Sequence, residues 1–222
     1  MDTPKPSRGA ALSMLCYVAA VHAEDTFGLL RGLAGDTAPL RIANFDLFKF
    51  VAWFVLPLIF VLVSRQMDWG YFRFTRWRRF DWALLAGMAL VGLAVMGMVY
   101  ALPSLLDTYS SMGRLPVAVK LRQAMWGNYG LVYLFSWLVG WEFLHRYVLL
   151  RQLDATWPRY GWLVVPAIEG VYHLQKPLLE AGGMVAFSLV FTPWVRERRN
   201  VLLPFFAHLV IEVELLLFLL FV

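Results

Sequence analysis

Ionisable side chains lie inside a long apolar stretch of this chain, where such groups are costly. Glu142, His145 and Arg146 fall within residues 130–150, which otherwise contain no charged side chain. An ionised side chain at the centre of a bilayer costs about 2.5–3.5 kcal/mol on insertion scales, so its presence usually marks a function. At helical spacing the three positions are i, i+3 and i+4, and we expect their side chains to project from one face.

Two further ionisable pairs occur later in the chain, again inside apolar segments. Glu169 and His173 are four residues apart, as are His208 and Glu212. At about 1.5 Å of helix rise per residue, Glu142 and His208 lie about 12–13 Å from the nearest basic loop, and His173 about 20 Å. These depths predict one shared polar cavity within the membrane.

Glutamate and histidine at one place in a membrane indicate hydrolysis. A carboxylate can take a proton from water, and an imidazole can share that water and later protonate a leaving amine. Two other interpretations remain open, namely polar contacts that only join helices and a proton or ion relay. A zinc site is a separate option, because His145, His173 and His208 with a glutamate are suitable ligands, but no spacing selects it over a metal-free site.

The composition indicates which elements must position these groups. The chain has 222 residues, of which 60 % are hydrophobic and only 16 % charged, which is typical of a multi-span membrane protein. Only helices and closed barrels satisfy the backbone in lipid, so we predict an all-α, polytopic membrane helix bundle. Six spans are expected, at residues 45–64, 81–103, 127–150, 160–175, 178–194 and 201–222. Residues 10–30 are either an additional first span or an interfacial helix.

Basic residues predict the orientation of the bundle. Loops 65–79, 151–159 and 195–200 contain five, two and three Lys or Arg residues, whereas loops 104–125 and 176–177 contain three and one. The positive-inside rule therefore assigns the first set to the cytoplasm. The same rule accounts for the net charge of +5, so we expect no nucleic-acid partner. Cys16 is the only cysteine, so the chain cannot form an intramolecular disulfide.

The ordered motifs resemble those of the type II CAAX prenyl endopeptidase-like proteins, also called CPBP intramembrane proteases. That family has Glu-Glu-x-x-x-Arg, then Phe-x-x-x-His, then His-x-x-x-Asn or a similar residue. Here the sequences Glu142–Arg146, Glu169–His173 and His208–Glu212 correspond to these motifs in the same order. The resemblance covers about residues 125–222, which become the expected protease-like core of a bundle at 45–222, preceded by an N-terminal segment at 1–44.

The resemblance implies an endopeptidase that hydrolyses a peptide bond near the cytoplasmic side of the membrane. Glu142, held by Arg146, and His173 would activate water, while His208 and Glu212 would stabilise the oxyanion. A metal-free glutamate mechanism is favoured, and Glu142, His173 and His208 would be the ligands if zinc were used. The expected partners are the lipid bilayer and a peptide or protein, either lipid-modified or a leader-bearing precursor. The expected location is a bacterial inner membrane.

The sequence also departs from the family pattern. Trp141 stands where the first glutamate is usual, Glu169 replaces phenylalanine, and His145 replaces an aromatic residue. These differences leave two alternatives to proteolysis. One is a catalytically inactive family member that acts as a bacteriocin-immunity or membrane-assembly factor, and the other is a proton-coupled transporter.

Overall fold

Long apolar runs, interrupted by glycine, proline and arginine, form the helices of this chain. The computed structural model describes residues 7–28, 41–42, 44–74, 77–103, 105–106, 116–127 and 130–221. These residues are helical nearly throughout, which confirms the predicted all-α class. The helices are α1 (Arg8–Phe27), α3 (Leu47–Lys49), α4 (Leu56–Val63), α5 (Arg79–Ala101), α7 (Val117–Trp126), α8 (Leu131–Glu142), α9 (Leu150–Thr156), α10 (Val164–His173), α11 (Leu178–Arg198) and α12 (Leu202–Phe221).

Shorter elements join these helices. Two π-helical segments, η1 (Phe50–Val55) and η5 (Phe143–Leu149), continue α3 into α4 and α8 into α9. Two 3₁₀ turns, η2 (Trp69–Phe72) and η6 (Gly161–Leu163), lie in loops. The predicted N-terminal segment at 1–44 lies partly outside the described residues. Its end forms a two-residue strand, β1 (Arg41–Ile42), which pairs antiparallel with β2 (Phe45–Asp46).

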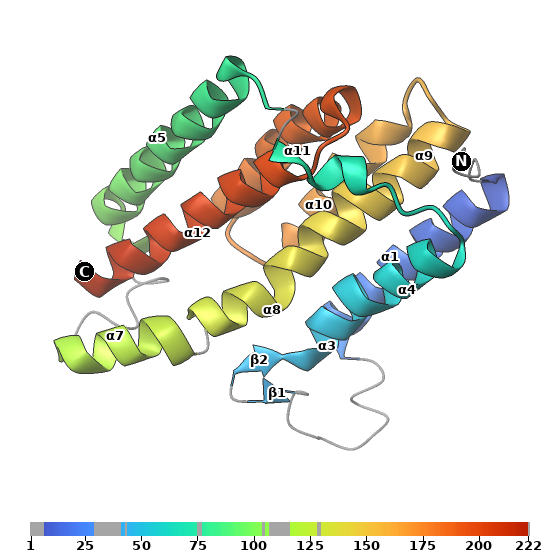
Figure 1. Ribbon diagram of the computed structural model, residues 1–222. Helices are drawn as coiled ribbons and strands as arrows, with labels where there is room; N and C mark the ends of the chain where they lie inside the picture. The colour runs from blue at the N-terminus through green and yellow to red at the C-terminus, as the bar shows by residue number, and fades with distance from the viewer. Residues whose placement is uncertain are drawn as a thin grey trace.

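The helix formed by α8, η5 and α9 runs through the middle of the bundle. Figure 1 shows α5 and α12 on one side of it and α1 and α4 on the other. Its core side chains are fully buried, including Leu138, Leu144 and Leu149. The helix carrying Glu142 is therefore surrounded by the other elements, as a site enclosed in a membrane requires.

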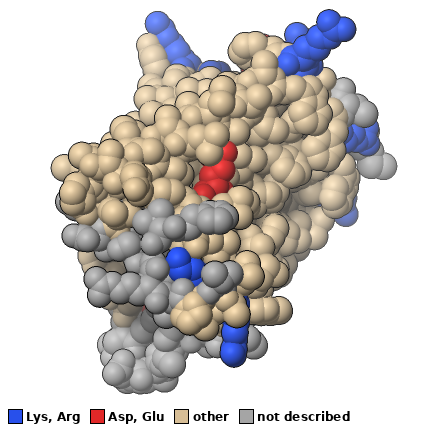
Figure 2. Space-filling model, turned by 90° about the vertical axis from the view of Figure 1, so that its left-hand side faces the viewer, with Lys and Arg blue, Asp and Glu red and all other residues tan. Residues whose placement is uncertain are grey.

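Three helices in the described part of the chain are long and apolar enough to cross a membrane. They are α5, α11 and α12 as far as Leu220. Only 17 % of the apolar window of α5 is buried, so most of this helix is available to contact lipid. Figure 2 shows a largely uncharged surface around a small acidic area on the side of the molecule where α12 ends. The chain is an integral membrane protein.

The predicted number of six spans is not confirmed. Helix α10 has only ten residues, or about 15 Å, against a hydrocarbon core of about 30 Å. The apolar helix at Leu47–Val63 is also shorter than the three crossing helices. Most of the predicted span at 127–150 lies in the continuous helix formed by α8, η5 and α9, of which only α8 and α9 are α-helical. Helix α1 packs into the bundle, with Ala11 and Val18 fully buried.

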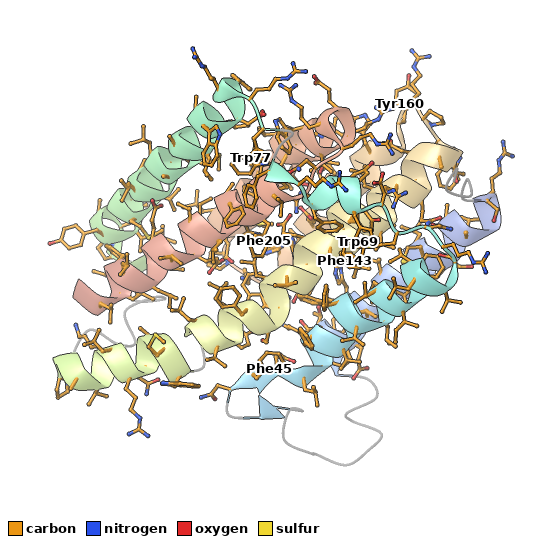
Figure 3. All side chains as sticks on the ribbon, in the orientation of Figure 1. Phe45, Trp69, Trp77, Phe143, Tyr160 and Phe205 are labelled. Carbon is orange, nitrogen blue, oxygen red and sulfur yellow. The ribbon has the colours of Figure 1, made fainter. Side chains whose placement is uncertain are left out.

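The segment between α4 and α5 folds back onto the middle helix. The backbone N–H of Asp68 donates to the Tyr147 hydroxyl at 2.5 Å, and Arg151 Nη1 donates to the carbonyl of Gln66 at 2.7 Å. Phe72 also stacks on Phe143, with ring centroids 6.2 Å apart. Figure 3 shows Phe143 near the centre of the molecule, with Phe45 and Tyr160 near opposite ends. These contacts fix η5 from one end of the bundle.

Gly140 allows α8 to approach η1 closely. A Cβ atom at this position would lie 2.7 Å from Trp53 Cβ and 3.0 Å from the Trp53 carbonyl carbon. Such distances require a shift of backbone rather than of a flexible side chain. Small residues are typical where membrane helices pack closely.

We predict that Gly140→Ala lowers the free energy of unfolding by about 1–3 kcal/mol, the usual cost of overpacking. Thermal unfolding of the purified protein in detergent would measure the change. Gly87→Ala is the matched control, because a Cβ there meets nothing within 4 Å. An unfolding temperature of Gly140→Ala equal to that of Gly87→Ala would contradict the prediction.

Candidate active site

The π-helical segment η5 begins directly after Glu142 and shapes the candidate site. The N–H of Leu150 bonds to the carbonyl of His145, five residues earlier. Such π-helical turns are rare and often occur at functional sites. Across the first turn, Arg146 Nη1 donates to Glu142 Oε2 at 2.8 Å. The predicted pair therefore forms within one helix.

Arg146 also joins two helices. Its Nη2 donates to Glu169 Oε2 of α10 at 2.8 Å, so one guanidinium bridges two carboxylates. The side chains of Arg146 and Glu169 are completely buried, and that of Glu142 is nearly so. Phe187 of α11 lies against the guanidinium, with its ring centroid 5.1 Å from Cζ. A flat, forked donor suits such a bridge because it can bind both carboxylates at once.

His208 of α12 is bonded to the other oxygen of Glu142. Its Nδ1 lies 2.9 Å from Glu142 Oε1, and a carboxylate oxygen accepts, so Nδ1 is the donor. In the neutral imidazole this leaves Nε2 as the acceptor. Glu212 Oε1 lies 3.8 Å from that Nε2, which is too far for a direct hydrogen bond. Two glutamates therefore flank His208, and Glu142 is the one that orients it.

His173 lies at the end of α10, beyond the Arg146 bridge. Its Nδ1 donates to the carbonyl of Glu169 at 2.8 Å, and its ring meets the Trp141 ring edge-on at 5.3 Å. Among the residues that the structure describes, His173 makes no hydrogen bond to Glu142 or His208. The link between His173 and Glu142 instead runs through Glu169, which lies one turn before His173, and through Arg146.

His145 does not join the group around Arg146, although helical spacing predicted a shared face. Its Nδ1 donates to the carbonyl of Trp141 at 2.8 Å, and its ring lies 5.0 Å from that of His22 in α1. The prediction of one common face is wrong for this residue. The structure groups His145 with Trp141 and His22, whereas Arg146 keeps the predicted four-residue contact with Glu142.

Sequence reasoning missed several residues around the site. Phe187 belongs to an unremarkable apolar run, and no pattern singled it out. His22 was visible as an ionisable residue in an apolar segment, but nothing in the sequence connects it to Trp141, on which it stacks at 5.5 Å. Trp141 itself is buried among five aromatic or imidazole rings, contributed by His22, Trp53, His145, Tyr172 and His173.

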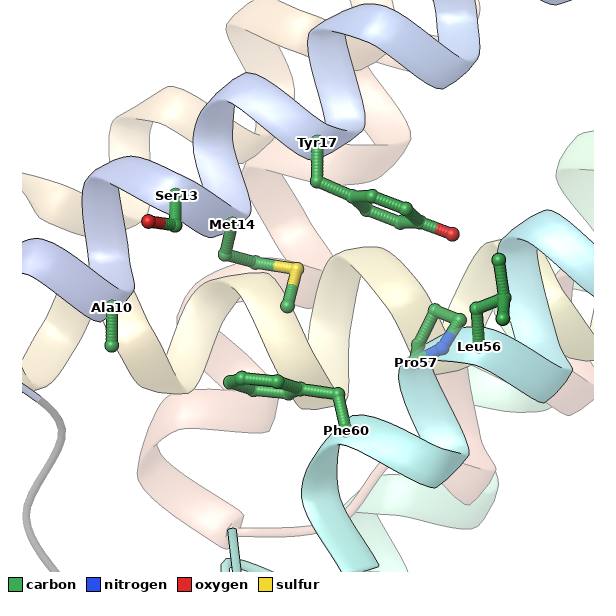
Figure 4. Close-up of a pocket in the computed structure, with 7 residues that line it drawn as sticks. All are labelled: Ala10, Ser13, Met14, Tyr17, Leu56, Pro57 and Phe60. Carbon is green, nitrogen blue, oxygen red and sulfur yellow. The ribbon is translucent and has the colours of Figure 1, made fainter. Parts of the chain in front are cut away.

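Two features bear on ligands. No three His, Cys, Asp or Glu side chains in the described ranges are arranged to hold a metal ion. Figure 4 shows an apolar pocket between α1 and α4 that contains none of the predicted site residues; it is lined by Ala10, Ser13, Met14, Tyr17, Leu56, Pro57 and Phe60.

The chain was compared with family models, curated proteins and solved structures. A family model described as type II CAAX prenyl endopeptidase Rce1-like matches residues 124–213, a range that contains all five predicted site residues. No curated protein and no solved structure matches the chain. The resemblance predicted from the three motifs is thus confirmed over these residues, and the matched family is one of proteases.

Proposed function

Since residues 124–213 match the family model of type II CAAX prenyl endopeptidase Rce1-like proteins, we propose that this protein is an intramembrane endopeptidase. It hydrolyses a peptide bond near the cytoplasmic side of the membrane, using water activated by glutamate and histidine. The proposed catalytic residues are Glu142, His173 and His208, with Arg146 and Glu212 supporting them.

One observation carries the proposal. Glu142 of the first motif contacts His208 of the third at 2.9 Å. Arg146 ties the same glutamate to Glu169 of the second motif. Three segments far apart in the sequence thus supply one continuous, buried set of hydrogen bonds. Polar contacts that served only to join helices would not need the three motifs of a protease family.

The proposed reaction is an addition followed by an elimination. A water oxygen attacks the carbonyl carbon of the substrate while the Glu142–His208 pair accepts a proton from that water. The C–N bond then breaks, and the proton passes to the nitrogen of the leaving amine. His173 has its Nδ1 committed to the carbonyl of Glu169, so its Nε2 is the nitrogen available to the water or the oxyanion.

The loops rich in arginine would lie in the cytoplasm, and the membrane would be the bacterial inner membrane. The substrate would be a peptide or protein, either carrying a lipid on its C-terminus or carrying a leader segment. The description of the matched family favours the first class.

We expect wild-type protein in liposomes to cleave a fluorescence-quenched peptide that ends in a farnesylated Cys-aliphatic-aliphatic-X sequence. A second probe with a leader-like apolar segment tests the other substrate class. Activity should survive 1,10-phenanthroline, because we propose a metal-free mechanism. Loss of activity with the chelator, and its recovery with Zn²⁺, would overturn that part of the proposal and favour Glu142, His173 and His208 as ligands.

The two alternatives predict different results. A folded wild-type protein that cleaves neither probe would favour an immunity or assembly factor, in which Trp141 marks the loss of chemistry. Proton flux in liposomes that responds to a pH gradient would favour a transporter. Cleavage without flux supports the peptidase.

A further inference from the structure

A buried ionic network lies beside the candidate site and is not used by the proposed mechanism. Asp25 of α1 accepts a hydrogen bond from the Tyr172 hydroxyl at 2.5 Å and forms an ion pair with Lys49 Nζ at 3.2 Å. The Asp25 and Lys49 side chains are only 9 % and 13 % exposed. The network joins α1, α3 and α10.

This network is connected to His173 through Tyr172. The two residues are adjacent in α10, and their rings meet edge-on with centroids 5.3 Å apart. The Tyr172 ring also contacts Trp141 at 5.2 Å. Once the hydroxyl is fixed by Asp25, the phenol ring is held as part of the surface against which His173 and Trp141 pack.

Helix α1 presents a second residue to the same place. His22 lies three residues before Asp25 and therefore on the same helical face. Its ring is 4.6 Å from that of Tyr172 and 5.5 Å from that of Trp141. His22 is 7 % exposed, and its Nε2 has no hydrogen-bond partner among the described residues. One face of α1 thus closes this side of the site.

A purely stabilising role accounts poorly for this arrangement. Buried ion pairs are often no better for stability than apolar packing of similar volume. Because this ion pair fixes the Tyr172 phenol beside the His173 imidazole, a role in positioning that imidazole explains it better. Helix α1 also lies outside the matched residues 124–213, so this contribution comes from the chain's own N-terminal part.

We propose that Tyr172, fixed by Asp25 and Lys49, is a positioning residue that sets the orientation of His173. The proposal rests on the proposed peptidase function. Tyr172→Phe keeps the ring and removes the hydroxyl, Asp25→Leu removes the acceptor, and Asp25→Asn keeps an acceptor oxygen while removing the charge. Tyr160→Phe is the matched control, because Tyr160 is 59 % exposed.

Two measurements test the proposal. With the cleaved probe peptide, Tyr172→Phe and Asp25→Leu should lower kcat by about tenfold to a hundredfold, the range expected from a misplaced catalytic group, with KM unchanged and Asp25→Asn less affected. In ¹⁵N-histidine NMR of the protein in nanodiscs, the His173 signals should shift in Tyr172→Phe while those of His208 stay in place. Tyr160→Phe should change neither kcat nor the spectrum.

The two readouts separate the possible failures. A wild-type protein that cleaves no probe would refute the peptidase function, while the NMR shift of His173 would still support positioning by Tyr172. Unchanged His173 signals together with an unchanged kcat in Tyr172→Phe would refute the positioning role and leave the peptidase function standing. A fall in kcat that merely follows a loss of folded protein, with unshifted His173 signals, would also count against it.

Discussion

Glu142→Gln should abolish peptide cleavage while the protein remains folded. Glutamine has nearly the same shape as glutamate and can still accept a hydrogen bond from Arg146, but it cannot take a proton from water. Its NH2 group would also face His208 Nδ1, which now donates to Glu142. The imidazole would then have to accept at Nδ1 and carry its proton on Nε2, so Nε2 could no longer take a proton from water. Loss of a positioned general base typically costs about 10²–10⁴-fold in rate.

The initial rate of probe-peptide cleavage in liposomes measures this effect. Glu197→Gln is the matched control, because Glu197 is an exposed residue at the end of α11. Circular dichroism and gel filtration would show that both variants fold. A cleavage rate of Glu142→Gln within a few-fold of wild type would exclude Glu142 as the base and leave His173 and His208 to act without it.

Arg146→Met should have the largest effect on stability. Arg146 is completely buried and binds two carboxylates at 2.8 Å each. Methionine fills much of the space but leaves Glu142 and Glu169 without their common cation. Breaking a buried ion pair by removing one partner costs about 3–5 kcal/mol, and we expect activity to disappear as well.

Thermal unfolding in detergent would measure the loss, with Arg73→Met, at an exposed arginine, as the control. Adding Glu169→Gln to Arg146→Met should restore part of the stability, because one of the two unpaired carboxylates is then neutral. Arg146→Lys should be more stable than Arg146→Met but less stable than the wild-type protein, since a single ammonium lacks the planar fork that reaches both carboxylates. Equal stabilities of Arg146→Met and Arg73→Met would show that the bridge contributes nothing.

Local spacing predicts the contacts within one helix and fails for contacts between helices. The pair Glu142–Arg146 follows from four-residue spacing, and the order of the three motifs is enough to indicate the protease family. The bond from Arg146 to Glu169 depends on how α10 packs against η5, and no rule of spacing gives that. The His22 and Asp25 contacts depend in the same way on where α1 lies.

The length of a hydrophobic segment was also a poor predictor of which segments cross the membrane. A hydrophobic run such as 160–175 was expected to cross the membrane, yet α10 has only ten residues. Ionisable groups in a short helix do not need a full crossing if they lie beside a longer one, as Glu169 and His173 lie beside α11. A segment is apolar when its side chains face lipid or other helices. Hydropathy alone therefore does not distinguish a helix that crosses the membrane from a shorter helix covered by other helices.

The π-helical turn at Phe143–Leu149 has a consequence for the alignment of this chain with its relatives. A single π-turn is equivalent to one residue inserted into an α-helix, and it rotates everything after it relative to everything before it. Because the spacing from Glu142 to Arg146 is the same as in the family motif, a relative that lacks the turn would need a one-residue gap after Arg146 to keep Arg151 and Trp141 in matching orientations. An ungapped alignment beyond Arg146 would match residue types while pairing side chains that point in different directions.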